Sequence, residues 1–159
     1  MRKNLRWLAP LLAVAGCIFI WQFSLADGES SAETSGRVLD WLNGRLSALG
    51  VDFRFSQLTV RKTGHFLGYF LLGGFLSFTL WVYEFRHYGG IALPAVLLIA
   101  CVDECIQRFS PGRDPSLGDV LLDTAGGACG ILLFFATVSA LFALFEKRRK
   151  KLEKFSKNY

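Results

Sequence analysis

Charged residues are scarce in this chain. They make up 19% of the 159 residues, whereas 52% are hydrophobic and 14% are aromatic, and the mean hydropathy is +0.37. Because a soluble domain normally carries about 25% charged residues, this composition argues against an ordinary soluble fold. It predicts instead an all-α protein whose helices lie in a lipid bilayer.

Residues suited to metal or disulfide chemistry are also few. The chain has two histidines and no CxxC or HxxxH spacing, and its four cysteines lie inside apolar runs, at Cys17, Cys101, Cys105 and Cys129. We interpret these cysteines as small buried hydrophobic residues. A thiolate site of Cys101 and Cys105 with His65 is the alternative, but its spacing matches no common zinc pattern. We therefore predict no metal and no cofactor.

Positive charge is concentrated at the two ends. Residues 146–159 contain seven Lys or Arg and two Glu, which gives +5, while Arg2, Lys3 and Arg6 add +3; since the total is +5, the segment between them sums to −3. This distribution favours a membrane protein with both termini in the cytoplasm, according to the positive-inside rule. We therefore interpret the basic tail as an anchor on anionic lipids, and we expect no nucleic-acid partner.

Four apolar runs are long enough to cross a bilayer at about 1.5 Å of rise per residue. They cover residues 5–26, 62–82, 91–109 and 117–145. We expect the first run to be an uncleaved anchor, although Ser24, Leu25 and Ala26 resemble a signal-peptide cleavage site. Four spans place residues 27–61 and 110–118 outside, and the loop with Arg86 inside.

The segment between the first two spans predicts a loop followed by an amphipathic helix. Residues 27–34 are small and polar, whereas residues 35–49 have apolar side chains at helical spacing and end before Gly50. Such a helix either caps the bundle or lies in the outer headgroup layer, and we favour the cap. The predicted organisation is an anchor (1–26), an extracytoplasmic segment (27–60), a transmembrane core (61–145) and a basic cytoplasmic tail (146–159).

Ionisable and polar residues recur at the predicted outer ends of the last three spans. A charge that faces lipid at mid-membrane costs about 3 kcal/mol, so these groups must face one another or a water-filled cleft. The helical rise places His65, Glu104, Asp119 and Asp123, from three helices, in one shallow layer. The predicted binding-site residues are Arg61, Lys62, His65, Tyr69, Asp103, Glu104, Gln107, Arg113, Asp119 and Asp123.

The fourth span combines acids and glycines on one face. Asp119, Asp123, Gly126, Gly127 and Gly130 follow a three-to-four spacing, which predicts close approach by a neighbouring helix, or by a second copy in a homodimer. Pro111 and Gly112 predict a tight turn that brings Arg113 above the acids. In the simplest alternative, Arg113 and Lys62 only neutralise the acids and hold the helices together.

These residues resemble the VanZ-like membrane protein family. The resemblance is closest over residues 60–132, and Gly68 and Ile106 stand where the family pattern has Glu and often His. It implies a bacterial plasma-membrane protein linked, through the family's namesake, to low-level teicoplanin resistance. The matching residues are Arg61, Lys62, His65, Phe66, Tyr69, Asp103, Glu104, Gln107, Phe109, Pro111, Gly112, Arg113, Asp119, Asp123, Gly126 and Gly130.

Two functions remain open on these residues. The first is an envelope factor that binds an anionic lipid, a cell-wall precursor or a lipophilic glycopeptide through Arg113, Lys62 and His65. The second is an intramembrane enzyme acting on a phosphate- or sugar-bearing lipid, with His65 or Glu104 as acid or base and Asp119 with Asp123 as metal ligands. A proton-coupled transporter suits the acids less well, because the chain is small.

Overall fold

The computed structural model describes residues 2–26, 28–85, 87–113 and 115–156. Within these ranges every regular element is a helix: α1 (Arg2–Leu25), α2 (Gly28–Ala48), α3 (Gln57–Val82), α4 (Tyr88–Gln107) and α5 (Leu117–Ser156). Four of them, α1, α3, α4 and α5, are long and apolar enough to cross a membrane. The predicted all-α bundle with four spans and an additional helix between the first two is confirmed.

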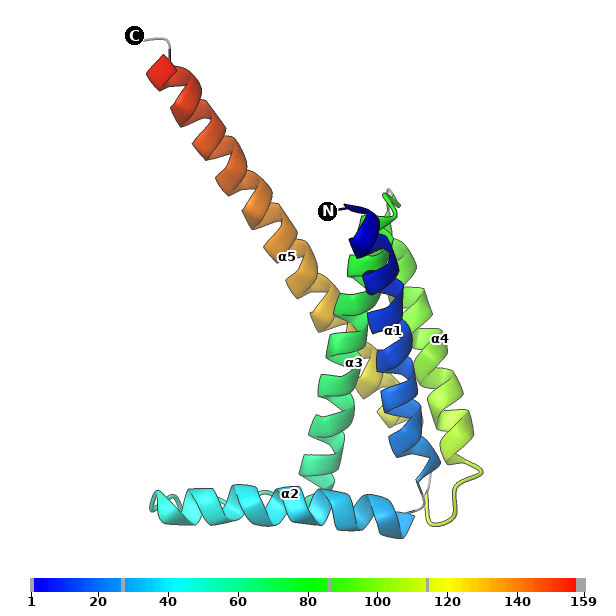
Figure 1. Ribbon diagram of the computed structural model, residues 1–159. Helices are drawn as coiled ribbons and strands as arrows, with labels where there is room; N and C mark the ends of the chain where they lie inside the picture. The colour runs from blue at the N-terminus through cyan, green and yellow to red at the C-terminus, as the bar shows by residue number, and fades with distance from the viewer. Residues whose placement is uncertain (1, 27, 86, 114, 157–159) are drawn as a thin grey trace.

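The four spans pack side by side, with α2 across one end (Figure 1). The two termini lie at the opposite end, as an even number of spans requires. The loop that joins α4 to α5 shares the α2 end. Arg86, expected in the loop between α3 and α4, lies outside the described residues.

The closest helix contact joins α3 to α5 through glycine. A Cβ added at Gly126 would collide with the Phe66 carbonyl oxygen, and one at Gly130 with the Phe70 carbonyl oxygen. Gly73 approaches the backbone of Gly127 in the same way. The predicted glycine face therefore does bring a neighbouring helix close, and that neighbour is α3 of the same chain.

A small apolar core continues beneath this contact. Along α4 the buried stripe runs through Ala92, Val96 and Ala100, each one helical turn apart, and meets Tyr69 and Leu72 of α3. Of the four cysteines, the half-buried Cys17 packs against this core, whereas Cys101, Cys105 and Cys129 are exposed. The prediction of buried cysteines is therefore wrong for these three, which lie on the outer surface where lipid would surround them.

The helix α2 begins earlier than the sequence suggested. Residues 28–34, predicted as a loop, form its first two turns. Their hydroxyl groups bond to carbonyls one turn earlier: Thr34 Oγ1 donates to Ser30 O at 3.0 Å and Ser35 Oγ to Ser31 O at 2.7 Å. Because the small polar side chains are satisfied inside the helix, their composition does not break it.

The far end of α2 follows the prediction more closely. Gly50 has φ 71°, and Val51 N donates to Leu46 O at 3.0 Å, which closes the helix. Asn43 Oδ1 then accepts from Phe55 N at 2.9 Å and ties the following segment back to α2. Most of α2 projects beyond the bundle (Figure 1), so the helix caps the bundle over a short stretch only. An amphipathic helix in this position suits the membrane surface.

The last helix is much longer than a membrane span. Its 40 residues extend over about 60 Å, twice the thickness of the hydrocarbon core. Its first half packs on α3 and α4, whereas its second half projects from the bundle (Figure 1). The basic tail expected from residue 146 continues this helix as far as Ser156.

Candidate functional site

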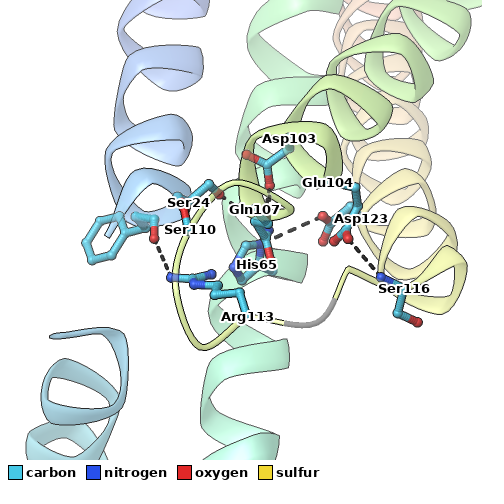
Figure 2. A network of polar contacts seen from close by, with 10 residues as sticks. Ser24, His65, Asp103, Glu104, Gln107, Ser110, Arg113, Ser116 and Asp123 are labelled. Atoms are coloured by element: carbon cyan, nitrogen blue, oxygen red, sulfur yellow. Dashed lines mark hydrogen bonds and ion pairs between the residues drawn. The ribbon is translucent and has the colours of Figure 1, made fainter. Parts of the chain in front are cut away.

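Several of the polar residues predicted to converge lie together at the α2 end of the bundle, and Figure 2 shows His65, Asp103, Glu104, Gln107, Arg113 and Asp123. His65 lies eight residues after the start of α3, about 12 Å along its axis. Its Nδ1 is 3.7 Å from Asp123 Oδ2 of α5 and 3.9 Å from Asp103 Oδ2 of α4. Three helices that are separate in the sequence therefore each contribute one ionisable side chain to the centre.

The two aspartates at the centre are buried. Asp103 and Asp123 are both 0% exposed, and the His65 side chain is 18% exposed. Gln107 Nε2 donates to Asp103 Oδ2 at 3.1 Å and lies 3.5 Å from Ser24 Oγ of α1. The amide of Gln107 thus orients Asp103 and connects it to the first span.

Glu104 and the loop after α4 fix the start of α5. Glu104 Oε2 accepts a hydrogen bond from Ser116 N at 2.9 Å, and Ser116 Oγ accepts one from Gly118 N at 3.1 Å. Glu104 is nearly buried, and its position at the N-terminus of α5 is favourable for a negative charge. This carboxylate therefore has a structural role as well as a place in the site.

The loop between α4 and α5 is held against α1. Gly112 has φ 73°, as expected for the predicted turn. Ser110 Oγ donates to Ser24 O at 3.0 Å, and the buried Arg113 donates through Nη2 to Phe23 O at 2.5 Å. Gly28 N donates to Pro111 O at 2.9 Å. The side chain of Arg113 thus lies near His65 (Figure 2) and also holds the end of the first span.

The outer rim of the site contains the remaining cations. Lys62 Nζ is 2.9 Å from Asp119 Oδ1, and the Lys62 side chain is 44% exposed. Arg61 and Lys62 line a small hollow of about 10 Å³, which reaches inward to His65, Glu104 and Asp123. Tyr69 lies one turn below His65, fully buried in the apolar core.

All ten residues predicted for the site therefore lie in or beside one polar layer. The sequence missed the contribution of α1, namely Ser24 and the carbonyl group of Phe23. Ser24 was considered only as part of a cleavage site, and no spacing rule connects it to residues more than 80 positions later. The thiolate alternative is not supported, because Cys101 and Cys105 face outward and His65 faces Asp103 and Asp123.

A larger apolar groove adjoins this polar layer. It has a volume of about 580 Å³ and lies between α1, α2 and α3. Phe19, Ile20 and Phe23 line it from α1, and Val38 and Leu42 line it from α2. Arg61 and His65 border both the groove and the polar hollow.

The four apolar spans around a buried polar layer define a multi-pass helical membrane protein. The model of the VanZ/LLP1 family matches residues 8–143, which includes most of the first span, and the chain belongs to this family. No curated protein and no solved structure gives a significant match.

Proposed function

We propose that this protein binds an amphiphilic envelope molecule with an anionic headgroup, whose apolar chain lies in the groove and whose headgroup lies at Arg61, Lys62 and His65. The proposal depends chiefly on one observation. Arg61 and His65 border both the apolar groove and the polar hollow. A molecule with one charged end and one apolar end fits such a junction.

The groove supports the apolar half of the proposal. Its volume of about 580 Å³ lies within the range of about 300–1,000 Å³ common for small-molecule sites. Gly64 and Gly68 lie along it on α3, and a Cβ at Gly64 would meet nothing within 4 Å. The helix surface there leaves room for an acyl or isoprenoid chain.

The residues at the rim of the polar hollow support binding of an anionic headgroup. Lys62 is half-exposed while paired with Asp119, and a guanidinium such as that of Arg61 suits the geometry of a phosphate or carboxylate. Arg113 was expected to hold the headgroup directly, but it donates to Phe23 O at the end of α1. In the proposed complex Arg61 and Lys62 therefore contact the headgroup, and Arg113 holds the end of α1, which lines the groove.

The expected topology places this site on the outer face of a bacterial plasma membrane, with both termini cytoplasmic. Available ligands on that face are anionic phospholipids, phosphate-bearing cell-wall precursor lipids and glycopeptides with an acyl chain. Binding of the last class would be consistent with the low-level teicoplanin resistance that the family's namesake suggests.

The test measures binding of defined molecules to the full-length protein in detergent by native mass spectrometry. The panel contains phosphatidylglycerol, undecaprenyl phosphate and teicoplanin, with zwitterionic phosphatidylcholine for comparison. We expect at least one anionic member to bind preferentially. Lys62→Gln should reduce that preference about tenfold, the equivalent of about 1.4 kcal/mol for one charge-assisted contact.

Two variants separate the groove from general surface effects. Gly64→Phe fills the groove and should therefore weaken binding of the ligand's apolar chain, whatever the charge of the headgroup. Gly44→Phe, on the exposed part of α2 where a Cβ also meets nothing within 4 Å, is the matched control. Equal binding of all four ligands, or equal effects of Gly64→Phe and Gly44→Phe, would contradict the proposal.

The enzyme alternative predicts turnover of a phosphate- or sugar-bearing lipid. Binding is the better supported function, because Glu104, one of the two acid or base candidates, accepts from Ser116 N and holds the start of α5. Incubating the wild-type protein and Glu104→Gln with the same lipids distinguishes the two functions. Product formation by the wild type that Glu104→Gln abolishes would favour the enzyme.

A further inference from the structure

The side chains of His65, Asp103 and Asp123 have the arrangement of a metal-ligand group. Each comes from a different helix and offers one ligand atom, and these atoms all lie within 4.8 Å of one another. Two ligands on a tetrahedral ion at about 2.0–2.2 Å are separated by roughly 3.4 Å. The observed distances of 3.7 and 3.9 Å from His65 Nδ1 to the two aspartates are a few tenths of an ångström longer.

Direct hydrogen bonds do not satisfy these carboxylates. The His65 to aspartate distances exceed the usual N–H···O range of about 2.7–3.2 Å. Among the described residues, neither oxygen of the fully buried Asp123 makes a hydrogen bond, and the same holds for Asp103 Oδ1. Buried charges of this kind are normally paired or coordinate a metal.

The surroundings supply the further features of a metal site. Gln107 Nε2 donates to Asp103 Oδ2 and so fixes one ligand from outside, as outer-shell groups do at metal centres. The hollow beside His65 and Asp123, of about 10 Å³, is close to the space of a single water molecule. It connects the group to the rim at Arg61 and Lys62.

The charges of the layer also favour a cation. Four carboxylates, those of Asp103, Glu104, Asp119 and Asp123, lie within or beside it. Lys62 is paired with Asp119 at the rim, and Arg113 adds one buried positive charge. Arg61 lines the hollow as a third cation, so the four carboxylates retain one net negative charge, which a bound cation would offset.

We propose that His65, Asp103 and Asp123 bind one divalent first-row transition metal ion between α3, α4 and α5. One imidazole with two carboxylates suits Zn²⁺ or Mn²⁺ better than Ca²⁺, which prefers an all-oxygen shell. This set differs from the Asp119 and Asp123 pair that the sequence suggested, since Asp119 is held by Lys62 at the rim. The metal site shares His65 with the proposed headgroup site, but its test does not require lipid binding.

The experiment measures metal binding to the full-length, chelator-treated protein in detergent, with Zn²⁺ and Mn²⁺ as probes. Wild type should bind one ion per chain by elemental analysis. Asp123→Asn should weaken binding at least about a hundredfold, since loss of an outer-shell partner alone costs about 10- to 100-fold. Asp119→Asn, one turn away on α5, is the matched control and should keep the ion.

A spectroscopic measurement on the wild type tests the same site without relying on variants that fold poorly. Bound Mn²⁺ should show pulsed electron paramagnetic resonance coupling to one histidine nitrogen. The chain has two histidines, and His87→Gln, at the start of α4, should retain the coupling. The proposal is wrong if wild type binds neither ion stoichiometrically, if Asp123→Asn binds like wild type, or if bound Mn²⁺ lacks the nitrogen coupling.

Discussion

The contact of Gly126 with α3 gives the sharpest test of how this bundle holds its site. In Gly126→Ala the new Cβ would lie 3.1 Å from Phe66 C and 3.2 Å from Phe66 Cα, and closer still to Phe66 O. Ordinary contact begins at about 3.4 Å. Both partners are backbone, so no side-chain rotation relieves the collision, and α3 and α5 must separate by roughly 1 Å.

The expected cost follows from that displacement. A gap of about 0.5–1 Å forfeits a quarter to a half of each dispersion contact across the interface, and overpacking of a close-packed site costs about 1–3 kcal/mol. The ratio of folded to unfolded protein should therefore fall about 5- to 150-fold. His65 neighbours Phe66, so its 3.7 Å distance to Asp123 should lengthen as well.

The assay is reversible unfolding of the purified protein in mixed detergent, followed by circular dichroism. The control is Gly64→Ala on α3, where a Cβ meets nothing within 4 Å, and which should be as stable as wild type or slightly more so. If Gly126→Ala equals Gly64→Ala in stability, α3 and α5 are not packed as described, and the reasoning fails.

Two further predictions concern the hydrogen bond from Ser116 to Glu104 and the orientation of the protein in the membrane. Glu104→Leu removes the acceptor for Ser116 N and should destabilise the protein by about 1–3 kcal/mol in the same unfolding assay; an unchanged midpoint would contradict the role given to Glu104. In a variant whose four native cysteines are alanine, Ser47→Cys on α2 should react with a membrane-impermeant maleimide on intact cells, whereas Glu153→Cys should react only after permeabilisation. The reverse labelling pattern would invert the proposed orientation.

The sequence by itself determined the number and type of the spanning elements. Each apolar run is long enough to cross the hydrocarbon core, and hydropathy depends only on local composition. It also indicated the polar layer, because charges such as Asp103 and Asp123 are too costly to face lipid, which restricts them to the bundle interior. The glycine spacing of α5 likewise predicted a close helix contact from local periodicity alone.

Local composition was misleading about the start of α2 and about the burial of the cysteines. Residues 28–34 look like a loop but form a helix, because hydroxyls such as that of Thr34 bond to the preceding turn. The buried cysteines predicted from hydropathy are mostly on the outside, since an apolar run does not reveal which face meets lipid.

The tertiary structure alone decided which polar groups meet. Ser24 and Gln107 are 83 residues apart, yet their side chains approach within 3.5 Å, and nothing in either local sequence encodes that pairing. Asp119 and Asp123 are a second example, because both lie on one face of α5. Lys62 pairs with Asp119 at the rim, whereas His65 approaches Asp123 in the interior. The contact at Gly126 brings α3 near enough to α5 for these pairs to form, because a side chain at this position would hold the two helices apart.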